Sequence, residues 1–261
     1  MCGIAGIWSI NECRREYLKN ALKKMSKKIQ NRGPDDYGDW IENSNNLGFC
    51  HRRLSIIELS KAGSQPMISE SGRYIITFNG EIYNYKELKK DIIAFNSSKN
   101  FRGNSDTEAL IEAIDLFGIE KTLKKIRGMF AFVIWDKKHK SMTMVRDRFG
   151  EKPLYYGWLK VNDLSHSKIF AFSSELSAIT TLSKVSPVIN KNALSSYFNN
   201  GYVQPPLSIY SDIYQIKPGH KLTIHSETQE GFVPISINSQ EKWWSAENKK
   251  YELNNYSINR K

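Results

Sequence analysis

The feature that most constrains this chain is a cysteine placed directly before an apolar strand pattern. Cys2 leads into the run GIAGIW at 3–8, which predicts a short buried strand whose glycines let other backbone approach closely. Removal of Met1 would put a thiol and a free α-amino group, with an ordinary pKa of about 8, on one residue. A nucleophile with an adjacent base is sufficient for acyl transfer. The alternative is that Cys2 is a small buried hydrophobic residue.

The composition indicates a folded chain in a reducing compartment. The 261 residues, 40% of them hydrophobic and 12% aromatic, suit one large domain or one domain with an extension. The three cysteines, Cys2, Cys13 and Cys50, give neither a disulfide framework nor a paired metal-ligand spacing, so we expect no metal site. No apolar stretch approaches the roughly 20 residues of a membrane span. Charged residues at 12–16 interrupt any signal-peptide core, and we expect a cytoplasmic protein without a membrane partner.

The surplus of positive charge does not by itself indicate a nucleic-acid partner. The net charge of +11 comes from lysines and arginines spread along the chain. In the densest cluster, at 19–28, apolar residues recur at helical spacing, so the lysines fall on the solvent face of an amphipathic helix. We therefore expect no nucleic-acid partner. A docking site for an acidic partner on this helix stays an alternative.

Strand patterns occur in hairpin-like runs, and helix patterns occur in separate groups. We expect strands at 4–8, 47–54, 74–78, 129–135, 141–145, 153–158 and 169–172. We expect helices at 17–31, 85–93, 105–117, 175–182 and 192–197, the third opened by a capping box of Ser105 and Glu108. This arrangement favours an α+β fold in which helices cover antiparallel sheet.

Several sequence blocks stand in a fixed order behind Cys2. They are RGPD at 32–35, HRRLSI at 51–56, FNGEIYN at 78–84, SDTE at 105–108, GMFAF at 128–132, RDRFG at 146–150 and PLYY at 153–156. Together they resemble the glutaminase domain of glutamine-hydrolysing asparagine synthetases, which are class II glutamine amidotransferases with an N-terminal nucleophile. The resemblance is close over about 2–178 and looser beyond. It implies an Ntn-hydrolase four-layer αββα sandwich of two antiparallel sheets between helices.

The resemblance implies a catalytic role for three residues. Cys2 is the nucleophile, while the side chain of Asn79 and the backbone of Gly80 form the oxyanion hole. An amide N–H and a backbone N–H can converge on one oxygen, and losing such a donor costs about 10²–10³ in rate. From the residues alone, Asn79-Gly80 is equally a turn that closes a hairpin.

The resemblance also implies a glutamine-binding set. Arg53 binds the α-carboxylate, for which a bidentate guanidinium is suited, and Asp106 binds the α-ammonium, with help from Glu81. The backbone of the next four residues forms the pocket wall: Leu54, Ser55, Ile56 and Ile57. From the residues alone, Arg53 is equally a structural ion pair, Asp106 an acid that stabilises a helix dipole, and Glu81 an exposed glutamate.

Other reactive residues have structural explanations. Cys50 and His51 are adjacent on a strand and face opposite ways, so they cannot pair as nucleophile and base. Arg52 faces away from Arg53 for the same reason. We expect 32–35 to form a structural loop beside the pocket, and Arg146, Asp147 and Glu175 to be ion-paired structure.

The chain lacks the second signature of the resembled family. The Ser-Gly-Gly-x-Asp-Ser loop of the synthetase domain, which adenylates the acceptor, is absent from the 261 residues. We therefore expect no cofactor here, with ATP and Mg²⁺ only on a synthetase domain or partner subunit. The expected organisation is an amidotransferase domain at 2–182, its C-terminal extension at 183–226, and a linker or tail at 227–261. In that tail Trp243 and Trp244 should pack back on the fold.

The expected function is hydrolysis of glutamine to glutamate and ammonia through a Cys2 thioester. The ammonia would supply an asparagine synthetase of the glutamine-hydrolysing type. One alternative is an inactive or partner-dependent remnant that serves as a binding module. Others are an amidotransferase half for a carboxylate acceptor other than aspartate, and a class II amidotransferase of the glucosamine-phosphate or phosphoribosylamine-forming type.

Overall fold

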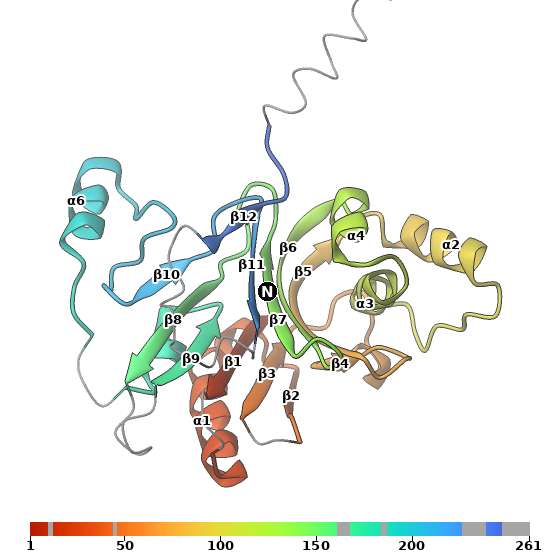
Figure 1. Ribbon diagram of the computed structural model, residues 1–261, viewed down its shortest axis with the longest axis horizontal. Coiled ribbons are helices and arrows are strands. Elements are labelled where there is room, and N and C mark those ends of the chain that lie inside the picture. The colour runs from red at the N-terminus through yellow and green to blue at the C-terminus, as the bar shows by residue number, and fades with distance from the viewer. Residues whose placement is uncertain (10–12, 44–45, 161–167, 184–186, 226–238, 247–261) are drawn as a thin grey trace, which may run out of the picture.

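Two antiparallel sheets lie face to face with helices on their outer faces (Figure 1). The computed structural model describes residues 1–9, 13–43, 46–160, 168–183, 187–225 and 239–246. The first sheet has the order β10 (Ile213–Gln215), β8 (Tyr155–Lys160), β9 (Lys168–Ser173), β1 (Gly3–Ser9), β3 (Leu47–Arg53) and β2 (Asp36–Ile41). The second has the order β12 (Glu241–Lys242), β11 (His220–His225), β7 (Ser141–Arg146), β6 (Gly128–Asp136), β5 (Tyr74–Ile82) and β4 (Met67–Ile68).

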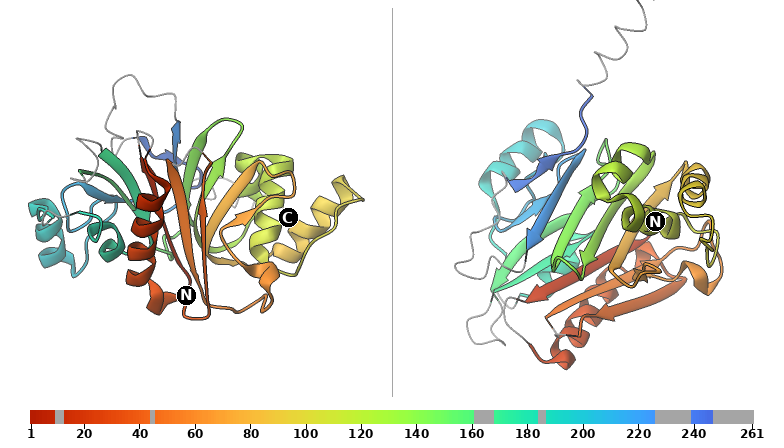
Figure 2. Two further views of the ribbon diagram at one scale, coloured as in Figure 1. Left: turned by 90° about the horizontal axis from the view of Figure 1, so that it is seen from below. Right: turned by 45° about the vertical axis from the view of Figure 1, so that its right-hand side comes forward.

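The helices are divided between the two sheets (Figure 2). The first sheet is covered by α1 (Arg15–Lys28) and α5 (Leu176–Thr180). The second is covered by α2 (Tyr85–Phe95), α3 (Asp106–Phe117) and α4 (Ile119–Lys125). The remaining helices are α6 (Lys191–Asn200) and two 3₁₀ turns, η1 (Gln30–Arg32) and η2 (Lys61–Gly63). The expected four-layer αββα arrangement is therefore confirmed.

Residue alternation along β1 shows why the fold needs four layers. Ile4 and Trp8 pack in the core between the sheets, whereas Ala5 and Ile7 pack beneath α1. Successive strand side chains point to opposite faces, so a strand that is apolar at every position must be buried on both. All seven residues of β1 are buried, and a neighbouring strand pairs with it on each side. Cys2, which directly precedes β1, is therefore anchored by a strand that is fully buried.

Two element boundaries differ from the prediction in ways that matter for the site. The strand predicted at 74–78 is longer in the structure, where β5 continues to Ile82. Asn79 and Gly80 pair with Ala131 and Phe130 of β6, so the hairpin-turn interpretation of this dipeptide is wrong. A glycine in a strand marks a close backbone approach as readily as a turn.

The predicted helix at 17–31 ends earlier than its apolar spacing suggested. The helix α1 stops at Lys28, and the chain turns through η1 toward the loop at 32–35. Ile29 is fully buried at this junction, beneath the first sheet. Packing of Ile29 therefore fixes where the chain leaves the helix.

Part of the C-terminal segment packs on the second sheet. The Trp243 ring stacks on Phe130 with ring centroids 6.0 Å apart, and Trp244 meets Phe149 edge-on at 5.3 Å. The expectation that both tryptophans pack back is confirmed. The rest of the predicted tail, 227–238 and 247–261, lies outside the described residues. Among those that are described, no helix is long and apolar enough to cross a membrane.

Candidate active site

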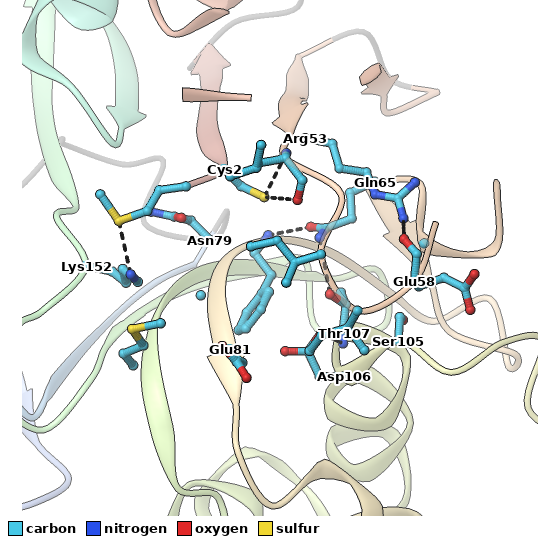
Figure 3. A pocket seen from close by; sticks show the side chains of 18 residues that line it. Cys2, Arg53, Glu58, Gln65, Asn79, Glu81, Ser105, Asp106, Thr107 and Lys152 are labelled. Atoms are coloured by element: carbon cyan, nitrogen blue, oxygen red, sulfur yellow. Dashed lines mark hydrogen bonds between the residues drawn. The ribbon is translucent and has the colours of Figure 1, made fainter. Parts of the chain in front are cut away.

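Cys2 stands directly before β1, and strand alternation turns its side chain, like Ile4, toward the second sheet. Its Sγ accepts the Leu54 N–H at 3.4 Å and lies 3.7 Å from the Leu54 carbonyl (Figure 3). Burial raises the pKa of the Cys2 thiol, and the Leu54 hydrogen bond only partly offsets this. The sulfur is therefore a protonated thiol at neutral pH and needs a base before it can attack.

The Cys2 backbone is held from the other side by Arg32. Arg32 Nε donates to the Cys2 carbonyl at 3.0 Å, and Arg32 Nη1 lies 3.2 Å from Glu175 Oε1. The predicted structural loop beside the pocket and the ion pairing of Glu175 are thereby confirmed. The direct grip on Cys2 was not predicted, because 30 residues separate the two groups in the chain.

Asn79 reaches the same pocket from the second sheet. On β5, Ile75 faces the sheet–sheet core, and alternation places Thr77 and Asn79 on that same face. Asn79 is 1% exposed, and neither its Nδ2 nor its Oδ1 has a hydrogen-bond partner in the described part of the chain. Leaving a buried polar group unpaired costs about 1–3 kcal/mol. Such a group in a pocket indicates that a ligand supplies its partner.

Gly80 is required by the spacing of two strands. A Cβ at this position would lie 2.2 Å from the Met129 carbonyl oxygen and 2.6 Å from the Phe130 Cα. Only glycine therefore lets β5 approach β6 this closely at the pocket wall. The glycine in the predicted oxyanion pair has this structural requirement beside any catalytic one.

Arg52 and Arg53 separate as alternation predicts. Arg52 Nε donates to Ser26 of α1 at 2.7 Å, on the outer face of the first sheet. Arg53 is 7% exposed and lines the pocket, where its guanidinium donates to the carbonyls of Ser60, at 3.0 Å, and Glu58. A guanidinium carries five donors, so two backbone bonds leave others for a ligand.

Asp106 begins α3 and lines the pocket on the side of the second sheet. Its carboxylate accepts the N–H groups of Ile82 and Thr107, both at 2.9 Å. Burial nevertheless raises the pKa of Asp106 to about 6. The capping box is half formed: Ser105 Oγ accepts the Glu108 N–H at 3.0 Å, while the Glu108 carboxylate binds Arg102 and Gly103 instead.

Of the remaining predicted binding residues, all except Ser55 line the pocket. The lining residues are Leu54, Ile56, Ile57 and Glu81. The Ser55 N–H donates instead to Asp35 Oδ2 at 2.8 Å, which ties this segment to the loop at 32–35.

Several lining residues were not predicted as site residues. They are Met1, Glu58, Gly63, Gln65, Phe78, Ser105, Thr107, Met129 and Lys152. Gln65 shows how such residues build the pocket. Its Oε1 accepts the Phe78 N–H at 2.7 Å and its Nε2 donates to Thr107 Oγ1 at 3.2 Å, which joins β5 to α3. A single glutamine outside any motif gives no signal of this role in the sequence.

The rejected Cys50–His51 dyad is absent from the structure. Cys50 is fully buried beneath α1, while His51 Nε2 lies 3.0 Å from the Phe78 carbonyl of the other sheet. Burial lowers the pKa of His51 to about 4, so its ring is neutral at neutral pH. His51 is therefore a structural link between the sheets.

The ion-pair prediction for Arg146 and Asp147 needs correction. Among the described residues neither forms a charge pair within 4.0 Å; both bind backbone groups of the 147–152 loop. A turn that exposes many N–H and C=O groups near the core needs such partners. Arg146 and Asp147 therefore have a structural role, but they hold the loop through hydrogen bonds to its backbone and not through an ion pair.

Residues 1–244 match the family model of a glutamine amidotransferase domain. Asparagine synthetases (glutamine-hydrolysing) 2 and 1 of Bacillus subtilis (strain 168) are 37% and 35% identical to it over 88% and 87% of this chain. The chain covers only 30% and 34% of these two relatives.

A solved structure supports the fold. Glutamine phosphoribosylpyrophosphate amidotransferase from B. subtilis, complexed with ADP and GMP, matches with a TM-score of 0.61 at 19% identity. The match covers 93% of this chain and 49% of that one. It confirms the predicted Ntn-hydrolase sandwich.

Proposed function

This chain belongs to the glutamine amidotransferase domain family, and from that premise we propose that it hydrolyses the side-chain amide of glutamine to glutamate and ammonia. One observation carries the proposal. The buried Asn79 amide, which has no hydrogen-bond partner among the residues that the structure describes, lines the same pocket as the Cys2 thiol. A pocket that joins a nucleophile to unsatisfied hydrogen-bond donors suits an acyl-transfer reaction.

The reaction begins with the amine of Cys2, which is free only after Met1 is removed. The amine takes the thiol proton, and Sγ attacks the carbonyl carbon of the glutamine side chain. The resulting oxyanion accepts hydrogen bonds from Asn79 Nδ2 and the Gly80 N–H. The amine then returns the proton to the leaving nitrogen, ammonia departs, and a thioester to Cys2 remains. Water, deprotonated by the same amine, releases glutamate and regenerates the thiol.

Charged groups at the pocket hold the two ends of the amino-acid group. Arg53 binds the α-carboxylate with guanidinium donors that its backbone bonds leave over. Asp106 binds the α-ammonium as the ionised carboxylate, and Glu81 lies on the same side of the pocket (Figure 3). The backbone at Leu54 and Ile57 forms the wall beside Cys2.

The proposed reaction releases ammonia, which a second activity would consume. The chain spans less than half of the length of the synthetases named above. We propose that a synthetase domain or subunit that binds ATP and Mg²⁺ consumes this ammonia in the cytoplasm, and that glutamine hydrolysis itself uses no cofactor. The acceptor is aspartate or another carboxylate, and its identity depends on that partner.

The test uses a chain cleaved from a fusion tag so that Cys2 is the first residue. Glutamate release from glutamine is measured, and a glutamine-analogue diazoketone is used to alkylate the nucleophile, with the modified residue located by mass spectrometry. We expect alkylation at Cys2 and loss of both signals in Cys2→Ala.

Cys50→Ala is the matched control, since it removes a buried thiol from outside the pocket. It should leave alkylation and glutamate release in place. Glutamate release that survives Cys2→Ala would contradict the mechanism. Absence of both alkylation and turnover in the folded, Cys2-first chain would contradict glutaminase function for the isolated domain.

A further inference from the structure

Lys152 is a buried cationic side chain that the proposed mechanism does not use. It is 5% exposed and lines the pocket of Cys2 and Asn79. In Figure 3 it lies on the opposite side of Cys2 from Arg53, away from the groups that hold the amino acid. Lysine is rarely buried without a specific partner.

The backbone of Lys152 is fixed by the loop that carries it. The Asp147 carboxylate accepts the N–H groups of Phe149, Glu151 and Lys152, each at 3.0 Å. Arg146 Nε donates to the Lys152 carbonyl at 2.8 Å. The side chain is therefore delivered to the pocket by a rigid turn.

The ammonium of Lys152 has a weak partner that does not persist. Its Nζ lies 3.1 Å from Met1 Sδ, and a thioether is a poor hydrogen-bond acceptor. Among the described residues no carboxylate lies within 4.0 Å of it. Removal of Met1, which the proposed function requires, takes away the sulfur and exposes the α-amine of Cys2. The Lys152 ammonium and the Cys2 amine then face each other across the space that the Met1 side chain occupied.

Covalent geometry limits how far apart the two nitrogens are. Five bonds join Met1 Sδ to the Cys2 nitrogen, so these atoms are at most roughly 6 Å apart. With the 3.1 Å contact between Lys152 and the sulfur, the two nitrogens lie within roughly 9 Å. Across an effective dielectric constant of about 20, a unit charge at that distance changes a protonation equilibrium roughly twentyfold.

The other charged groups around Cys2 have partners or lie on the substrate side. Arg32 is paired with Glu175, and Arg53 lies 4.0 Å from Asp36. Asp106 and Glu81 line the pocket where the amino-acid group is proposed to bind. Lys152 therefore differs from the two arginines in having no carboxylate partner in the described part of the chain.

We propose that Lys152 is a positioning residue whose charge keeps the Cys2 α-amine in its neutral, basic form once Met1 has left. This inference rests on the proposed function, because it assigns a role in the proton transfer from thiol to amine. Two ammonium groups at this separation repel, so the neutral amine is favoured. The same proton still moves from Sγ to the amine and back, and Lys152 itself neither gains nor loses one.

The test titrates the amine without turnover. Chains cleaved to begin at residue 2, in a Cys2→Ala background, are labelled with acetic anhydride across pH 5–10, and acetylation of the N-terminal peptide is measured by mass spectrometry. Replacing Lys152 by Met should raise the midpoint of labelling by about 1.4 pH units, the shift that corresponds to a roughly twentyfold change. Lys152→Arg should keep the midpoint within a few tenths of a unit of the parent.

Lys125→Met is the matched control, since it removes an exposed lysine that pairs with Asp91 on the surface. It should leave the midpoint unchanged. Thermal melts verify that each variant is folded, and Lys152→Gln replaces Lys152→Met if the latter does not fold. In chains that keep Cys2, the acid limb of kcat/KM should move with the labelling midpoint.

An unchanged midpoint in folded Lys152→Met or Lys152→Gln overturns the role of Lys152 and leaves the glutaminase proposal intact. A shifted midpoint without glutamine hydrolysis by the Cys2 chain supports the electrostatic effect while contradicting the glutaminase proposal.

Discussion

The two walls of the pocket treat their polar groups differently. On the first-sheet wall, Cys2 Sγ bonds to Leu54 and the Arg53 guanidinium donates to two backbone carbonyls. On the second-sheet wall, the Asn79 amide is buried with no partner in the described residues. The first-sheet wall thus has its geometry fixed before a ligand arrives, whereas the second-sheet wall carries an amide that is still free to bond a ligand. The contrast separates holding the nucleophile from stabilising charge that appears only during reaction.

The unpaired Asn79 amide lowers the stability of the folded state. An unpaired buried amide disfavours the folded state by about 1–3 kcal/mol, a substantial share of a domain's total of about 5–15 kcal/mol. The Asn79 side chain should therefore matter much more for turnover than for folding.

The largest effect should follow from removing the unpaired Asn79 amide. Asn79→Ala should lower kcat for glutamine hydrolysis by about 10²–10³, because it deletes one oxyanion donor. Thermal stability should not fall, since no hydrogen bond in the described structure is lost and the buried unpaired amide is removed. Steady-state kinetics and a thermal melt measure the two quantities.

Thr77→Val is the matched control for Asn79→Ala. Thr77 lies on the same face of β5, its Oγ1 is likewise buried without a partner among the described residues, and it does not line the pocket. Its replacement should leave kcat unchanged. Equal loss of kcat in both variants would mean that the strand, and not the Asn79 amide, carries the effect.

The next effect tests the fixed wall. Arg53→Lys should weaken glutamine binding to a Cys2→Ala chain by roughly 10–100-fold, the range given by losing a charge-assisted hydrogen bond worth about 1.5–3 kcal/mol. Isothermal titration measures the Kd. Arg52→Lys, one residue away on the opposite face, should leave the Kd within threefold of the parent. Similar losses in both would contradict the assignment of Arg53 to the carboxylate.

A third effect depends on pH through Asp106. Because burial raises the pKa of Asp106 to about 6, the carboxyl is ionised above that pH and neutral below it. The α-ammonium of glutamine needs the ionised form, so glutamine binding to Cys2→Ala should weaken by about tenfold per pH unit below pH 6. Titrations between pH 4.5 and 7.5 measure this. Asp106→Asn should bind weakly with no such pH dependence, and a flat profile in the parent would exclude Asp106 as the partner.

The smallest effect concerns the outer support of Cys2. Glu175→Gln removes the charge that pairs with Arg32, but the Glu175 side chain is 36% exposed and such pairs contribute about 0–1 kcal/mol. The melting temperature should fall by no more than about 4 °C and kcat by less than threefold. A loss above tenfold would show that the Arg32 grip on the Cys2 carbonyl depends on this pair.

The sequence predicts best where periodicity and burial agree. β1 and α3 are predicted to within about two residues, because long alternating or helical patterns leave few options. Alternation predicts that Arg52 and Arg53 face opposite ways, whereas the choice of Arg53 as the binding residue rests on the family resemblance. The extent of β5 was missed, since Asn79-Gly80 carries a strong turn signal that pairing with β6 overrides. Local propensity cannot show that override.

Contacts between distant segments were beyond the sequence. The Lys152–Met1 contact joins residues 151 positions apart, and the Arg32–Cys2 contact joins residues 30 apart. Each arises from the way the two sheets and their loops stack. A lone lysine or arginine gives no periodic signal that would announce such a partner.

The hydrogen bond between His51 and the Phe78 carbonyl has a consequence for chain-length selection. It joins β3 two residues before Arg53 to β5 one residue before Asn79. The span between the proposed carboxylate clamp and the proposed oxyanion donors is thus set by the stacking of two sheets, not by a pliable loop. A side chain one methylene shorter, as in asparagine, could not bridge that span by drawing the walls together. The discrimination between five-carbon and four-carbon amides would then be a property of the scaffold itself.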